Sequence, residues 1–156
     1  MRKLLSVVFI LVLFSSVCFA ADDQITFNGE LTVNGQKING NESISMPKPK
    51  ALNTQDDDPK IMANLFKKEG YDKAEADLKI EASKSFKVSG SRVNGVFVIK
   101  SGKLQSVGGK KAPFEIPAQK GDYYIGINNT PEEDETQDDA AMLQYVKISV
   151  VKPSKK

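Results

Sequence analysis

The sequence contains no histidine and no tryptophan, and Cys18 is its only cysteine. Zinc sites built from cysteine and histidine, histidine-assisted nucleophiles and internal disulfides are therefore excluded. Carboxylates, lysine, serine and tyrosine remain for catalysis, and none of them forms a visible constellation with an activated base. We predict that the protein is not an enzyme and that it binds no cofactor or metal.

The first 20 residues have the pattern of a secretory signal peptide. Two basic residues precede an apolar run at positions 4–13, and the small-residue exit Val-Cys-Phe-Ala ends at Ala20. An uncleaved anchor is the alternative, but the run is short for a membrane span of about 20 residues. Phe19, which follows Cys18, disfavours lipid attachment. We expect cleavage after Ala20 and a periplasmic or secreted protein that is not bound to a membrane.

The charge of the protein changes when residues 1–20 are removed. Arg2 and Lys3 leave the 22 basic residues, so 20 basic residues face 20 acidic ones and the formal net charge falls from +2 to zero. A nucleic-acid partner is disfavoured, because the only basic cluster is the C-terminal tail at 153–156. The remaining chain is long enough for one domain that buries roughly two thirds of its unfolded surface.

The N-terminal segment, residues 21–46, alternates short β-prone runs with asparagine-glycine pairs. Because Asn-Gly tolerates the positive φ angles of tight hairpin turns, each pair predicts a hairpin corner, and the segment is expected to form a β-hairpin or small meander. The pairs are Asn28-Gly29, Asn34-Gly35 and Asn39-Gly40.

A linker and a helix are predicted next. Prolines and a triple aspartate make residues 47–58 a surface linker without regular structure. Asp58 and Pro59 suit the N-cap and first position of a helix over 59–69, and Gly70 suits its end. The apolar face of this helix comprises Ile61, Met62, Leu65 and Phe66.

Six short apolar runs after residue 70 predict β-strands. They are spaced at roughly ten residues with no helix between them, which indicates an all-β fold, an antiparallel β-sandwich, over residues 59–152. The expected core residues are Leu78, Ile80, Phe86, Val88, the run 95–100, Phe114, Ile116, Tyr123, Ile125, Ile127, Val146, Ile148 and Val150.

The order of four segments carries a family resemblance: GYDKAEADLKIEASKSFKVSGS, NGVFVIKSGKLQ, FEIPAQKGDYYIGI and YVKISVV. It resembles the strand order of the bacterial pre-peptidase C-terminal type β-sandwich, over about residues 70–151. Within that group the chain is most similar to the periplasmic inhibitors of g-type and i-type lysozymes. The resemblance implies a small exported sandwich that inhibits a lysozyme.

The same resemblance implies a binding turn. The inhibitors insert a loop that reads Ser-Gly, one or two variable residues and Tyr into the lysozyme cleft. The matching residues here are Lys120, in place of the serine, Gly121, Asp122 and Tyr123, followed by Tyr124. One interpretation is a wedge with Tyr123 or Tyr124 as an aromatic anchor. The other is structural, with Gly121 forming the turn and Tyr123 packing on the sandwich edge.

An acidic loop follows this strand and contains Glu132, Glu133, Asp134 and Glu135. Such a concentration of charge can speed capture of a cationic partner, and lysozymes are usually cationic. A solvated loop and a calcium site are the alternatives, and both also apply to the three aspartates at 56–58.

Two functions remain open. The first is a lysozyme inhibitor that uses residues 120–124 and is steered by the acidic loop. The second is a non-inhibitory module that binds glycan or another cell-envelope component. The absence of tryptophan weakens the glycan version, because stacking on sugars prefers that side chain.

Overall fold

β-Strands make up most of the described part of the chain, which is residues 23–54, 56–128 and 142–154 of a computed structural model. The elements are β1 (Gln24–Val33), β2 (Gln36–Ser45), β3 (Lys50–Asn53), α1 (Pro59–Lys68), β4 (Leu78–Ala82), β5 (Phe86–Ser89), β6 (Val93–Lys100), β7 (Lys103–Val107), β8 (Phe114–Ile116), β9 (Gly121–Ile127) and β10 (Met142–Val151). The prediction of a mainly β fold with one short helix is confirmed. No helix in these ranges is long and apolar enough to cross a membrane.

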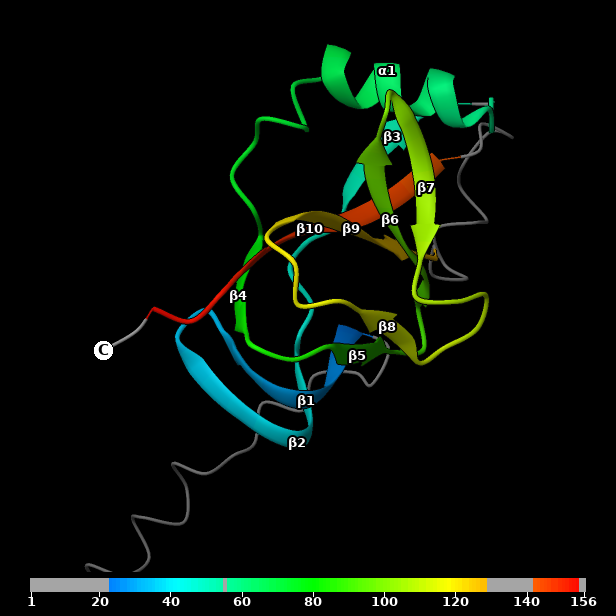
Figure 1. The fold of residues 1–156 in the computed structure, drawn as a ribbon. Coiled ribbons are helices and arrows are strands. Elements are labelled where there is room, and N and C mark those ends of the chain that lie inside the picture. Colours follow the sequence, from blue (N-terminus) through cyan, green and yellow to red (C-terminus); the bar gives the residue numbers. More distant parts are fainter. Residues whose placement is uncertain (1–22, 55, 129–141, 155–156) are drawn as a thin grey trace, which may run out of the picture.

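The strands form one sheet that curls into a sandwich-like arrangement (Figure 1). Their order is β7-β6-β9-β10-β4-β1-β5-β8, with β2 paired to β1 and β3 paired to β10. All pairs are antiparallel except β10 and β4, which run parallel. This pair is the one departure from the predicted antiparallel pattern: β10 pairs antiparallel with β9 over seven residues and parallel with β4 over four.

The N-terminal hairpin consists of two long strands, so the prediction that all three asparagine-glycine pairs form corners is wrong. Asn34 and Gly35 form its turn, with φ angles of 48° and 83°. The pairs Asn28-Gly29 and Asn39-Gly40 lie opposite each other in the middle of β1 and β2. There β1 changes partner from β5 to β4, and a Cβ on Gly29 would lie 3.0 Å from the Cβ of Phe86. Gly29 therefore allows close packing against Phe86, and neither Gly29 nor Gly40 ends its strand.

The predicted linker at 47–58 contains a strand, which corrects the expectation that it lacks regular structure. β3 pairs antiparallel with the start of β10. Leu52 explains the pairing, because its side chain is 2% exposed and packs beneath α1. Burial of one apolar side chain outweighs the polar composition of the surrounding segment.

Helix α1 begins and ends where the local signals predict. The side chain of Asp58 accepts hydrogen bonds from two backbone N–H groups of the first turn at 2.8 and 3.4 Å. Pro59 is the first helical residue, and Gly70 follows the end of the helix with a φ of 74°. The helix, Pro59–Lys68, is one residue shorter than predicted.

The buried face of α1 differs from the predicted one at one position. Ala63 and Phe66 are fully buried, and Met62 and Leu65 are half-buried, whereas Ile61 is 42% exposed. At about 100° per residue, Ile61 lies some 140–160° around the helix from Ala63 and Phe66. The prediction that Ile61 faces the core is therefore wrong.

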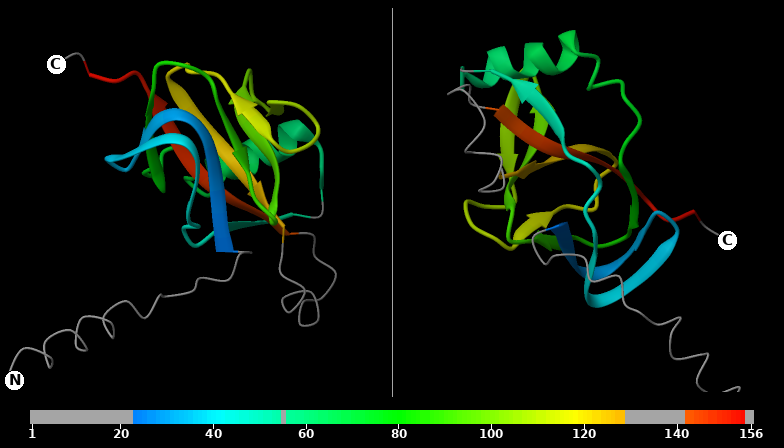
Figure 2. Two further views of the ribbon diagram at one scale, coloured as in Figure 1. Left: turned by 90° about the horizontal axis from the view of Figure 1, so that it is seen from below. Right: turned by 180° about the vertical axis from the view of Figure 1, so that it is seen from behind.

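Two hydrophobic cores lie on opposite faces of β9 and β10. The main core is enclosed by the curled sheet and includes Ile25, Phe27, Leu31, Ile80, Phe86, Val88, Tyr123, Ile125, Val146 and Ile148. The second core lies beneath α1 and consists of Leu52, Phe66, Leu104, Tyr124 and Tyr145. Consecutive residues of β9 and β10 alternate between the two cores. Helix α1 and the β1–β2 hairpin lie at opposite ends of the molecule (Figure 2).

Candidate functional site

The turn that leads into β9 brings the five predicted partner-binding residues into one short segment. Lys120 is exposed, Gly121 opens β9 and is half-buried, and the side chain of Asp122 is 46% exposed. Tyr123 and Tyr124 are only 5% and 3% exposed. The surface of this site is therefore formed by Lys120 and Asp122, and the two aromatic rings lie inside the protein.

Burial corrects the expectation that one of these tyrosines is an exposed anchor. β9 is a central strand, with β6 on one edge and β10 on the other. Tyr123 packs into the main core and Tyr124 into the second core. The alternation of the strand does place Tyr124 on the face opposite Ile125 and Ile127, but α1 covers that face. The cover comes from a helix some 60 residues earlier in the chain, which strand alternation cannot reveal.

Tyr123 ties the turn to the strand from the side of the main core. Its hydroxyl donates a hydrogen bond to the carbonyl oxygen of Gln119 at 3.3 Å. Burial raises the pKa of the Tyr123 hydroxyl, so it remains a neutral donor at ordinary pH. The ring and its hydroxyl together hold the turn against the sheet.

Tyr124 lies in a cluster of aromatic rings beneath α1. Its ring centre is 4.8 Å from that of Phe66 and 5.6 Å from that of Tyr145. Burial raises the pKa of Tyr124 to about 12, and the nearby carboxylates of Asp122 and Asp72 add to the effect. Tyr124 therefore fixes β9 from the side of the second core.

Lys147 is the residue of this site that the sequence reading missed. It lies on β10 and is 2% exposed. Its Nζ donates hydrogen bonds to the carbonyl oxygens of Tyr71, Asp72 and Ala74 at 3.1, 3.0 and 2.6 Å. The same Nζ is 3.6 Å from the carboxylate of Asp122. Lys147 thus connects the loop after α1 to the first residues of β9.

A signal for this role was present in the sequence. Lys147 stands between Val146 and Ile148 in the final apolar strand. Its side chain shares a face with Tyr145, which places it beneath the loop after α1. A charge in such a position requires several partners, because burying an unpaired ammonium group is very costly.

A surface hollow of about 280 Å³ lies beside the turn. It is lined by Lys67, Asp72, Ile99, Asp122 and Tyr124. These side chains come from the end of α1, the loop that follows it, the end of β6 and the start of β9. We call this feature the α1–β9 hollow.

The other acidic candidates contribute no described binding site. Glu132, Glu133, Asp134 and Glu135 lie outside the described residues, as does the expected signal peptide at 1–20. In the triple aspartate, Asp58 caps α1 and Asp56 Oδ1 accepts a hydrogen bond from the backbone N–H of Asp58 at 2.9 Å. Across the described ranges, no three His, Cys, Asp or Glu side chains are grouped to hold a metal ion.

Comparison with known proteins provides no relative: no protein family matches the chain, and no similar curated sequence or solved structure was found. The resemblance to the pre-peptidase type sandwich therefore stays a prediction from the sequence.

Proposed function

We propose that the chain is an exported binding protein that presents the turn at 117–122 to a partner protein, and that this partner is a g-type or i-type lysozyme. The class of partner comes from the resemblance of the turn sequence to the lysozyme inhibitors. One structural observation supports a binding role for the turn: buried side chains hold its backbone at Gln119 and the carboxylate of Asp122, while the charges of Lys120 and Asp122 stay exposed.

Rigid presentation of the turn favours binding. Tyr123 holds the turn from the main core through its hydrogen bond to Gln119, and Tyr124 holds it from the second core. Lys147 lies 3.6 Å from Asp122 and restrains that carboxylate. A segment that is already ordered loses little conformational entropy when it binds. In this proposal the tyrosines position the turn, and Lys120 and Asp122 contact the partner.

Electrostatics determine how such a partner is captured. Exposed ion pairs contribute only about 0.2–1 kcal/mol each, so Lys120 and Asp122 give specificity more than affinity. The acidic residues at 132–135 raise the association rate with a cationic lysozyme, as the sequence suggests. Affinity then depends on the close contacts made around the turn.

The alternative is a module that binds glycan without inhibiting an enzyme. Such a module needs an exposed aromatic surface on which sugar rings can stack. Within the described ranges, Ile61 is the only large hydrophobic side chain that is exposed. The glycan alternative therefore gains no support from this surface.

An inhibition assay tests the proposal. The mature protein is titrated into g-, i- and c-type lysozymes that are hydrolysing cell walls. We expect stoichiometric inhibition of a g- or i-type enzyme, which weakens as salt rises because exposed charges are screened beyond about 10 Å at 0.1 M. Lys120→Ser should maintain or strengthen inhibition, Asp122→Lys should weaken it, and Lys111→Ser, on an exposed loop, should have no effect. Absence of inhibition by both the native protein and Lys120→Ser would refute the proposal.

A further inference from the structure

The α1–β9 hollow carries two carboxylates directly beside the proposed binding turn. Asp72 and Asp122 line it together with Tyr124, Ile99 and Lys67. Because Asp122 belongs to both the turn and the hollow, a partner seated on the turn also meets the hollow. The free hydrogen-bonding capacity of these two carboxylates indicates what the hollow binds.

Lys147 lies close enough to Asp122 for an ion pair but donates no hydrogen bond to it. An ammonium group has three hydrogens to donate. All three are used by the carbonyl oxygens of Tyr71, Asp72 and Ala74, at 2.6–3.1 Å. The Asp122 carboxylate lies at 3.6 Å from the same nitrogen, beyond hydrogen-bond distance. Its oxygens therefore remain able to accept hydrogen bonds from a ligand.

Asp72 contributes an independent observation. Its Oδ1 atom is buried and has no hydrogen-bond partner among the described residues. A desolvated carboxylate oxygen without a donor is costly, and a bound water, an ion or a nearby positive charge reduces that cost. A positive charge in the hollow offsets this cost electrostatically, even when it contacts only the accessible part of the carboxylate.

Lys67 is the flexible cation that lines the hollow and can compete for it, whereas Lys147 is fixed by its three carbonyl partners. Lys67 lies in the last turn of α1, its side chain is exposed, and it forms no ion pair with any described residue. Because a lysine side chain is long and flexible, it can lean toward the carboxylates or move away. Lys67 is thus expected to weaken the binding of a second cation.

We propose that the α1–β9 hollow receives a cationic side chain, the ammonium of a lysine or the guanidinium of an arginine, from the partner bound at the turn. Its N–H groups donate to Asp122, its charge offsets that of Asp72, and its alkyl stem contacts Ile99 and Tyr124. The identity of the partner rests on the proposed function, whereas the chemistry of the hollow can be tested without that partner.

Small cations provide this test. Ethylguanidinium or n-butylammonium chloride is titrated into the mature protein at constant ionic strength, and backbone amide shifts are followed by NMR. We expect saturable shifts at residues 70–73, 99 and 122–124. Asp122→Asn or Asp72→Asn should weaken binding about tenfold, the loss expected for a charged hydrogen bond.

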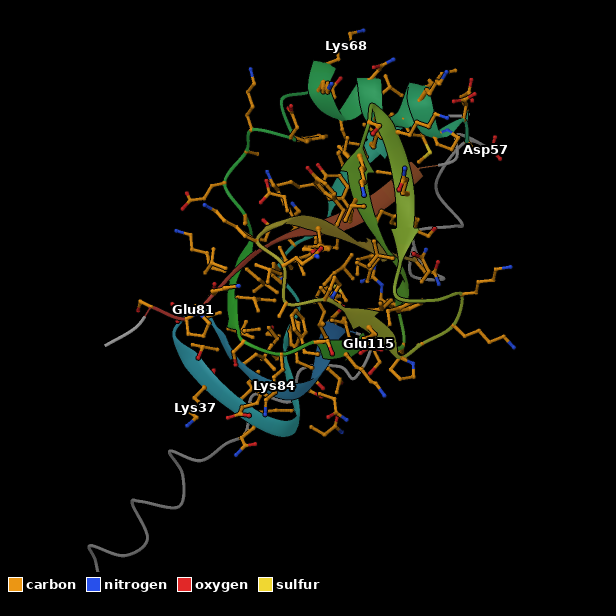
Figure 3. The ribbon with its side chains drawn as sticks, in the orientation of Figure 1. Lys37, Asp57, Lys68, Glu81, Lys84 and Glu115 are labelled. Carbon is orange, nitrogen blue, oxygen red and sulfur yellow. The ribbon has the colours of Figure 1, made fainter. Side chains whose placement is uncertain are left out.

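Two further variants serve as controls. Lys67→Gln should strengthen binding of the probe by removing the competing cation. Glu81→Gln removes an exposed carboxylate that lies at the opposite end of the molecule from Lys68, in the last turn of α1 (Figure 3). This variant should leave the binding of the probe unchanged. Shifts that fail to saturate, or that are equal in the native protein and in both aspartate variants, would overturn the inference.

The outcomes separate this inference from the proposed function. Saturable probe binding that is weakened in the aspartate variants supports the cation site, even when no lysozyme is inhibited; that result overturns only the proposed function. Inhibition of a lysozyme without saturable probe binding overturns the cation site and leaves the proposed function in place.

Discussion

Replacing Lys147 with methionine removes the group that connects the loop after α1 to the start of β9. Three carbonyl oxygens lose a charged donor, at about 1.5–3 kcal/mol each, but the cost of burying the ammonium also disappears. The net effect of breaking a buried ionic network at one partner is about 3–5 kcal/mol. We expect the free energy of unfolding to fall by this amount and Tm to fall by about 10–20 °C.

Urea and thermal unfolding, followed by circular dichroism, measure this change. Methionine has a volume similar to that of the lysine stem, so the substitution isolates the ammonium group. Lys110→Met, on the exposed loop between β7 and β8, is the matched control and should change stability by less than about 0.5 kcal/mol. If Lys147→Met loses less than about 1 kcal/mol, the hydrogen-bond network does not hold the site together and the reasoning is wrong.

Three other predictions follow from buried groups and from the N-terminal sequence. Tyr145→Phe removes a buried hydroxyl that has no partner among the described residues, so it should raise stability by about 1 kcal/mol. Tyr71→Phe loses a 3.2 Å hydrogen bond to a carbonyl oxygen and should lower stability. Urea unfolding that shows Tyr145→Phe to be the less stable of the two variants would contradict this prediction. Burial raises the pKa of Tyr124 from 10.0 to about 12, so between these pH values the unfolded chain releases a proton that the folded protein keeps. The contribution of Tyr124 should be absent below pH 10 and should then lower stability by about 1.4 kcal/mol per pH unit up to about pH 12, in addition to the loss from Tyr123, whose pKa is also raised. The native protein should therefore lose stability more steeply than Tyr124→Phe, and equal slopes would argue against the shift. Intact-mass analysis of the exported protein should show Ala21 as the first residue, and retention of residues 1–20 would contradict the signal-peptide assignment.

Local signals in the sequence predicted those elements that depend on local interactions. The cap, the proline and the terminal glycine of α1 act within one or two turns, so the bounds of the helix were predicted to within one residue. The β9 and β10 strands also follow their period-two patterns. In each of these cases, neighbouring residues alone carry the necessary information.

The same local sequence signal leads to different structures where tertiary contacts determine the backbone conformation. Asn34-Gly35 forms a hairpin turn, whereas Asn28-Gly29 and Asn39-Gly40 lie within strands, because β1 changes partners at that point. The polar segment around Leu52 forms strand β3, because β10 pairs with it and the Leu52 side chain is buried beneath α1. Such contacts join residues that are distant in the chain, and no local pattern records them.

The candidate site shows the same limit. The sequence predicts Lys120, Gly121 and Asp122 in a turn before a strand; Lys120 precedes β9, whereas Gly121 and Asp122 are its first two residues. The burial of Tyr124 depends on a helix that precedes it by more than 50 residues. The partners of Lys147 are main-chain carbonyl groups, which any residue type can provide. Sequence could indicate that Lys147 needs partners, and only the fold could identify them.

Hydrogen exchange measured on a complex with a g-type or i-type lysozyme tests the central claim most directly. If the turn and the adjoining hollow are the binding surface, amides at 117–122 and 70–74 should gain protection, while those on the outer edge of β2, at the other end of the molecule, should not. Protection confined to β2, or no complex with either class of lysozyme, would contradict the claim that this turn binds the partner.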